Sequence, residues 1–176
     1  NDNFGTDIRV SDETDKLLDT GGGIKKAAPL FDSDKPVLIH NVDILSNVDL
    51  AHLYAMHGDS AATLVVSSRK TKRYLLFDDD MRLKGWTNIE TGEVRSPYPD
   101  LNVADCRMLA FSGIHVISPS MFGLMDEFPD KFGIMDFYLK VCDKVVIKGY
   151  NKSDLRLMDV GKLDTLAEAE NFINQL

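Results

Sequence analysis

The amino-acid sequence predicts an α/β domain in which a mixed, mostly parallel sheet is flanked by helices and carries an antiparallel hairpin insert. Continuous apolar runs such as PVLIHN (36–41) are typical of strands that are buried on both faces. Segments with apolar residues at helical spacing separate these runs, which is the order expected for a parallel α/β sheet. Residues 73–94 instead alternate short apolar runs with turns that contain Asp or Gly, and this pattern indicates antiparallel hairpins.

Five elements are predicted in the first 68 residues. In chain order they are a strand at 7–11, a helix that starts near Gly22, a strand at 36–41, a helix at 47–58 and a strand at 61–68. The helix at 47–58 has a suitable N-cap residue in Asn47 and a terminating glycine in Gly58. The strands are short β-branched or apolar runs.

The second half resumes the alternation of strands and helices after the hairpin insert. Its predicted elements are a loop at 96–102, a strand at 107–118, a short helix from Ser118, a helix at 133–142, strands at 144–150 and 155–161, and a helix at 162–176. The last helix places five apolar side chains on one face, those of Leu163, Leu166, Ala169, Phe172 and Ile173.

Composition limits the possible functions. The chain has 176 residues, enough for one domain, and residues 1–176 are predicted to form a single domain. Its formal net charge of −8 argues against a nucleic-acid partner, because a polyanion is repelled by that field. No apolar run reaches the length of a membrane span, so no membrane partner is expected. Two cysteines without CxxC spacing indicate a reduced, cytoplasmic protein, and the oligomeric state stays open.

Polar residues follow two of the predicted strands. Asn41 ends the strand at 36–41 and Asp43 follows it, and Asp159 comes directly after LRLM (155–158), where the strand-like segment at 155–161 passes into a loop. Ligands of open α/β sheets bind beyond the carboxyl ends of strands. Two carboxylates there are suited to Mg²⁺, which takes one or two protein carboxylates plus substrate phosphates. The alternative is that each Asp only caps a turn before a helix.

The segment LLDTGGGIKK (17–26) contains three consecutive glycines before a predicted helix. It matches neither the P-loop pattern nor G-x-G-x-x-G. Glycines let a backbone approach a flat ligand closely, but they are equally typical of a flexible turn.

These segments together resemble the sugar-1-phosphate nucleotidyltransferases, also called nucleotide-sugar pyrophosphorylases. The resemblance rests on LLDTGGGIKKAAPLF, PVLIHNVD, AFSGIHVISPSMF and MDVGKLDTLAEAENF, which occur in the family's order along nearly the whole chain. The mannose-1-phosphate guanylyltransferase-like and N-acetylmuramate-1-phosphate uridylyltransferase groups are the most similar. The resemblance implies the Rossmann-like nucleotide-diphospho-sugar transferase fold. It also implies a Mg²⁺-dependent transfer of a nucleotidyl group from a nucleoside triphosphate to a sugar-1-phosphate, with release of pyrophosphate.

The resemblance also implies roles for individual residues. Asp43 and Asp159 would be the catalytic, metal-binding carboxylates. The nucleotide side would consist of Thr20, Gly21, Gly22 and Asn41. The sugar side would include Gly113 and Asp136.

One feature of the family has no counterpart here. The family begins with a strand and a Gly-rich, Arg-containing phosphate loop, whereas this chain begins without Met in a strand-like run. The domain is therefore expected to lack its first strands and phosphate-binding loop, as a fragment or as a natural short form, and to have weak or no activity alone. The alternative function is a non-catalytic sensor or regulatory subunit that binds a nucleotide-sugar.

Roles are also predicted for three further residues. His57 is predicted to interact with a helix end, and His115 to be a satisfied core residue rather than a ligand. Trp86 in the hairpin insert could stack on a sugar or base, or serve only in packing.

Overall fold

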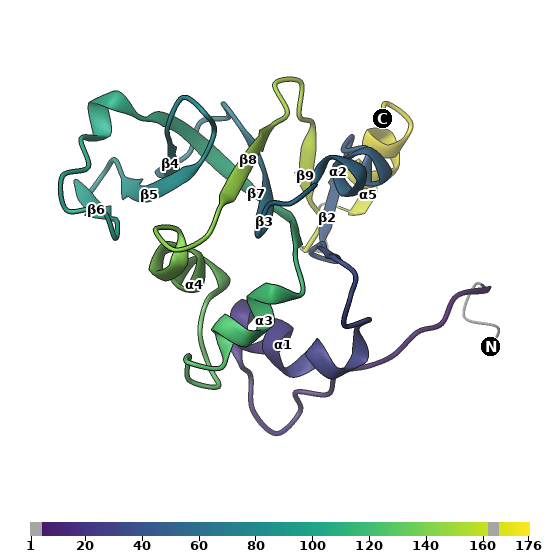
Figure 1. Cartoon of the computed structure of the whole chain (residues 1–176). Helices are drawn as coiled ribbons and strands as arrows, with labels where there is room; N and C mark the ends of the chain where they lie inside the picture. Colours follow the sequence, from purple (N-terminus) through teal and green to yellow (C-terminus); the bar gives the residue numbers. More distant parts are fainter. Residues whose placement is uncertain (1–4, 162–165) are drawn as a thin grey trace.

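The computed structural model describes residues 5–161 and 166–176 and confirms the predicted fold class, a mixed sheet flanked by helices (Figure 1). The large sheet has seven strands. Six of them lie in the order β6 (Glu93–Arg95), β5 (Leu83–Asn88), β4 (Arg73–Phe77), β7 (Arg107–Ile117), β3 (Ala62–Ser67) and β8 (Ile147–Asn151). The seventh, β1 (Val37–Ile39), pairs with the end of β7.

The direction of the strands differs from the mostly parallel sheet predicted by the sequence. Strand β7 is antiparallel to β1, β3 and β4, and in the described residues only β3 and β8 pair in parallel. The physical reason is the hairpin insert. Strands β4, β5 and β6 reverse the chain before β7, so β7 enters the sheet against the direction of β1 and β3.

A second, two-stranded sheet lies beside the large one. It pairs β2 (Ile44–Ser46) with β9 (Leu157–Asp159) in antiparallel orientation. The sequence predicts β9 but not β2, which is only three residues long.

The helices cover both faces of the large sheet. They are α1 (Asp19–Ala27), η2 (Ala28–Leu30), α2 (Leu50–Met56), η3 (Val103–Asp105), α3 (Ser120–Met125), α4 (Ile134–Val141) and α5 (Leu166–Ile173). Strand β3 is buried on both faces: Leu64 belongs to the larger apolar cluster with α3 and α4, and Val65 to the smaller cluster with Leu53 of α2. This explains why β3 is a continuous apolar run. Within the described residues, no helix has the length and apolar character needed to cross a membrane.

Three predicted elements need correction, and a fourth lies partly outside the described residues. Residues 7–11 form no strand, because they lie apart from the sheet with exposed or half-exposed side chains. Helix α1 begins at Asp19 rather than near Gly22, so it contains all three glycines. Helix α2 is capped by Asp49, whose Oδ1 accepts a hydrogen bond from His52 N at 2.9 Å, and not by Asn47. The start of the predicted C-terminal helix, residues 162–165, lies outside the described residues.

The side chain of Asn47 joins two loops instead of capping a helix. Its Nδ2 donates to Asp154 O and its Oδ1 accepts from Arg156 N, both at 2.9 Å. These bonds hold the segment before β9 against the segment after β2, and so support the two-stranded sheet.

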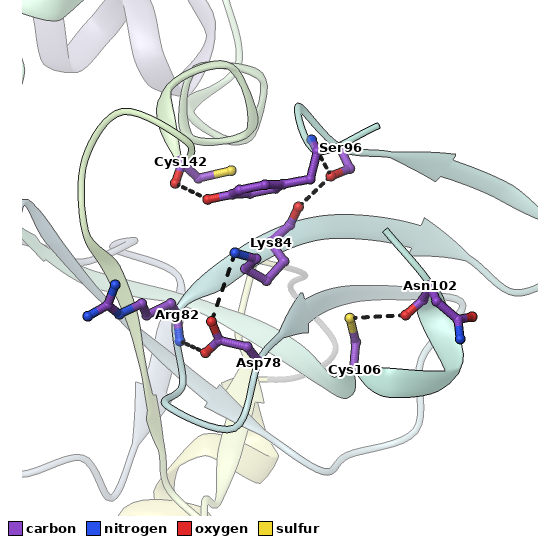
Figure 2. Close-up of polar contacts among 8 residues, drawn as sticks. Asp78, Arg82, Lys84, Ser96, Asn102, Cys106 and Cys142 are labelled. Atoms are coloured by element: carbon purple, nitrogen blue, oxygen red, sulfur yellow. Dashed lines mark hydrogen bonds and ion pairs between the residues drawn. The ribbon is translucent and has the colours of Figure 1, made fainter. Parts of the chain in front are cut away.

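Polar contacts stabilise the hairpin insert internally, and one of them joins it to α4 (Figure 2). Ser96 Oγ donates to Lys84 O at 2.6 Å, and Lys84 Nζ lies 4.0 Å from Asp78 Oδ2. The Lys84 ammonium also lies 3.7 Å from the centre of the Tyr98 ring, whose hydroxyl donates to Cys142 O at the end of α4. The insert and α4 are therefore held as one unit. Both cysteines of the chain are free thiols.

Candidate active site

The two predicted metal-binding carboxylates are brought together by the small sheet. Ile44 of β2 is paired with Asp159 of β9, and Val160 N donates to Asp43 O at 2.8 Å. Asp43 and Asp159, 116 positions apart in the sequence, are thus neighbours in space, and both are exposed.

Gly161 shows how close the two carboxylates are. A Cβ atom at Gly161 would lie 3.2 Å from Asp159 Oδ1 and 3.2 Å from Asp43 Oδ2. Both oxygens flank the same point, so their separation is at most twice that distance. This bound is wider than the separation of about 4 Å or less that one Mg²⁺ ion bound to both oxygens requires, so the two exposed side chains would have to draw together around the ion. The donor set fits, because Mg²⁺ prefers carboxylate oxygens and completes its shell with water or phosphate.

In the part of the chain that the structure describes, no cluster of three or more His, Cys, Asp or Glu side chains suited to a metal occurs. Asp43 and Asp159 therefore remain a predicted two-carboxylate site. Such a site would hold Mg²⁺ weakly until a phosphate-bearing ligand supplied further oxygens.

Asn41 and Gly113 form a second contact next to this pair. Gly113 has φ +86°, a left-handed conformation that favours glycine, and a Cβ there would lie 3.0 Å from Asn41 Nδ2. The pairing of Ile39 with His115 places the residues just beyond β1 opposite Gly113 of β7. The structure thus brings together one residue predicted for the nucleotide side and one predicted for the sugar side.

The glycines of α1 pack against protein rather than facing an open surface. Gly21 N and Gly22 N both donate to Phe132 O, at 2.9 and 3.1 Å. A Cβ at Gly21 would overlap the Phe132 ring, and one at Gly22 would overlap the backbone oxygen of Asp130. Close helix packing is therefore a sufficient reason for these two glycines. Their predicted contact with a nucleotide remains a prediction.

Thr20 connects α1 to the start of α4. Its Oγ1 accepts a hydrogen bond from Ile134 N at 3.0 Å, which satisfies one of the free N–H groups at the first turn of α4. Asp136 lies in the same turn, and its Oδ1 is 2.5 Å from Arg95 Nη2. The sequence gives no signal for Arg95, which lies 41 residues from Asp136 on strand β6.

The predicted site residues therefore form two groups. Asn41, Asp43, Gly113 and Asp159 lie where β1, β2, β7 and β9 meet, whereas Thr20, Gly21, Gly22 and Asp136 lie where α1 meets α4. No hydrogen bond or ion pair among the described residues links the two groups directly.

The two buried histidines have different environments. His57 Nδ1 lies 2.9 Å from Thr63 Oγ1 and its Nε2 lies 2.9 Å from Ser118 Oγ, so it joins α2, β3 and β7 instead of only facing a helix end. Its pKa is lowered by burial. His115 is 2% exposed, and neither ring nitrogen has a hydrogen-bond partner among the described residues, contrary to the expectation of a satisfied core residue.

Burial lowers the pKa of His115 to about 3, opposed in part by the nearby backbone of Gly113. The ring packs against Phe111 and, edge-to-face, against Tyr138, with centroids 5.6 and 5.7 Å away. His115 is thus a neutral imidazole enclosed by aromatic rings, and it cannot act as a ligand or base at the surface.

Comparisons with known proteins place the chain by fold. No protein-family model matches the sequence, and no curated protein does. The structure is similar to UDP-glucose pyrophosphorylase complexed with UDP-glucose, with TM-score 0.66, 15% identity, and coverage of 91% of this chain and 64% of that one. A putative glucose-1-phosphate thymidylyltransferase from Bacillus anthracis in complex with a sucrose gives TM-score 0.67, 13% identity, and coverage of 93% and 64%. HddC from Yersinia pseudotuberculosis complexed with GMP-PN gives TM-score 0.62 and 20% identity, with coverage of 89% of this chain and 64% of that one.

This chain spans less than two thirds of the length of each of these structures. At such identities the likeness establishes the fold and not the substrate. The chain has the nucleotide-diphospho-sugar transferase fold.

Proposed function

We propose that the protein transfers a nucleotidyl group from a nucleoside triphosphate to a sugar-1-phosphate, giving a nucleotide-sugar and pyrophosphate. The observation that carries the proposal is the pairing of Asp43 and Asp159 around Gly161. Two carboxylates from distant strands, held at one point beside Asn41 and Gly113, suit a phosphate ligand with its metal ion. The shared fold and the ordered segments that resemble the family give further support.

In this proposal Asp43 and Asp159 would hold Mg²⁺. The bound ion would neutralise the phosphate oxygens and orient them for transfer. Two neighbouring carboxylates repel each other, and a bound dication would remove that repulsion. The small sheet positions the backbones of the two residues through hydrogen bonds before any ligand arrives.

The remaining residues would bind and position the substrates. Asn41 and Gly113 would present a side-chain amide and a backbone segment without a Cβ close to the carboxylates. Thr20, Gly21 and Gly22 would form the nucleotide side, where Thr20 is exposed and the two buried glycines would act by letting α1 pack closely against residues 130–132. Asp136 would accept hydrogen bonds from sugar hydroxyls while Arg95 holds it in place.

The test has a catalytic and a binding readout. Pyrophosphate release is measured with a panel of nucleoside triphosphates and sugar-1-phosphates, and nucleotide-sugar affinity is measured by calorimetry with and without Mg²⁺. The binding arm matters because it tests the nucleotide-sugar pocket without requiring turnover.

Asp159→Asn should remove the Mg²⁺ dependence of both readouts, lowering affinity about tenfold or more, because the amide cannot replace a carboxylate ligand. Asp80→Asn, an exposed aspartate in the turn between β4 and β5, is the matched control and should change nothing. Undiminished Mg²⁺-dependent binding in Asp159→Asn would falsify the metal assignment. If no panel member binds or reacts in Mg²⁺, the proposed function is wrong.

A further inference from the structure

A small hollow between the hairpin insert and α4 contains three arginines. Its volume is about 340 Å³, and its lining includes Arg69, Arg73, Arg95, Trp86, Phe111 and Met135. We call this hollow the arginine pocket. Its volume is at the low end for ligand sites, so it suits a group of monosaccharide size rather than a whole nucleotide.

The arginine pocket carries positive charge that its own residues do not neutralise. None of its described lining residues is acidic, and the one carboxylate paired with its lining is that of Asp136, bound to Arg95. In the described part of the chain, neither Arg69 nor Arg73 forms an ion pair. Two unpaired guanidinium groups share one hollow in a chain whose net charge is −8. Their mutual repulsion is relieved when an anion binds between them.

The walls of the arginine pocket also favour an anionic ligand over water. Arg69 Nη2 donates to Phe111 O at 2.9 Å, which fixes this guanidinium above β7. The half-buried ring of Trp86 lies beneath Arg95, whose Cζ is 5.7 Å from the ring centre. Guanidinium groups can donate two parallel hydrogen bonds to a pair of carboxylate or phosphate oxygens, and Arg69 and Arg73 are exposed, so an incoming anion can reach both.

The arginine pocket adjoins the sugar side of the proposed site. Phe111 lies two residues before Gly113 on β7, and Met135 directly precedes Asp136 on α4. A neutral sugar bound at Gly113 and Asp136 would leave Arg69 and Arg73 without a partner.

We propose that the arginine pocket binds an anionic substituent of the sugar, so that the sugar phosphate is acidic beyond its 1-phosphate. The proposal rests on the proposed function, from which it takes the sugar side. The substituent is a carboxylate or a second phosphate, which present the same oxygens to the arginines. Trp86 and Phe111 then contact the apolar face of the same sugar.

The experiment compares three ligands by calorimetry at constant ionic strength, without triphosphate. They are glucose 1-phosphate, glucuronic acid 1-phosphate and glucose 1,6-bisphosphate. At least one acidic ligand should bind about tenfold more tightly than glucose 1-phosphate, and which one does identifies the substituent. Arg73→Gln should reduce this preference to about twofold or less. Lys70→Gln, which removes the same charge from an exposed residue outside the lining, should leave it unchanged.

Two outcomes overturn the proposal: equal affinity for all three ligands, or an equal loss of preference in Lys70→Gln and Arg73→Gln. Pyrophosphate release on the same three ligands separates this proposal from the proposed function. An Arg73-dependent preference without release from any ligand contradicts the proposed function alone. Release that is equally efficient with glucose 1-phosphate contradicts the acidic sugar alone.

Discussion

Lowering the pH from 7.5 to 5.0 should destabilise the protein through His115. In the folded state burial holds the pKa of this imidazole near 3, whereas its ordinary value is 6.5. Between these two values the unfolded chain binds a proton that the folded protein does not. The free energy of unfolding therefore falls as the pH falls through this window, and the contribution is fully present only above pH 6.5.

The size of the effect follows from the two pKa values. At pH 5.0 the proton bound by the unfolded chain lowers the free energy of unfolding by about 2 kcal/mol relative to pH 7.5. The loss would be about 4 kcal/mol at pH 3. His57, whose pKa is also lowered by burial, adds a loss of the same sign. The aspartates with lowered pKa values titrate below 3.8, outside the range measured.

The assay is urea unfolding followed by circular dichroism at pH 7.5 and 5.0. His115→Leu has a similar volume and no ring nitrogens, so its loss of stability between the two pH values should be about 2 kcal/mol smaller than that of the wild type. It should also be no less stable at pH 7.5, because it removes two unpartnered buried polar atoms. His52→Gln, an exposed histidine, is the control and should behave like the wild type. An equal pH dependence in wild type and His115→Leu would refute the reasoning.

Three further predictions concern packing and the metal site. Gly22→Ala should lower the free energy of unfolding in urea by about 1–3 kcal/mol, because its Cβ would meet the backbone oxygen of Asp130, which cannot move aside. Gly23→Ala in the same helix is the control: its Cβ would meet only the flexible carboxylate of Glu13, so this variant should be neutral or stabilising. Gly161→Ala should weaken Mg²⁺ binding measured by calorimetry, because its Cβ would enter the space between the two carboxylates. Its melting temperature should stay close to that of the wild type, and an unchanged Mg²⁺ affinity would contradict the proposed position of the ion. Tyr98→Phe removes the bond to Cys142 O and should cost about 0.5–1.5 kcal/mol in urea unfolding, so no measurable change would show that this bond does not fix the hairpin insert.

The placement of the candidate site could be predicted only in part. Asp43 and Asp159 stand out in the sequence because each follows a strand, and the structure does bring them together. The contact depends on the pairing of β2 with β9, and β2 is too short to give a periodic signal. The arginine pocket leaves only a partial signature, because Arg69 and Arg73 belong to one basic run, RKTKR (69–73), that reads as a solvated turn. Arg95 and the residues of α4 join them only after the hairpin insert folds against α4.

The sequence by itself determined the class of fold, most of its elements and the strand-end carboxylates. It could do so because burial on both faces of a strand, or on one face of a helix, leaves a pattern among neighbouring residues. Tertiary structure decided the antiparallel direction of β7, the inclusion of the three glycines in α1 and the unpartnered state of His115. Each of these depends on segments far apart in the chain: the hairpin insert turns β7 around, Asp130 and Phe132 cover the glycines, and Tyr138 on α4 helps to enclose His115. Distant contacts of this kind leave no periodic trace in the sequence, so only the folded chain shows them.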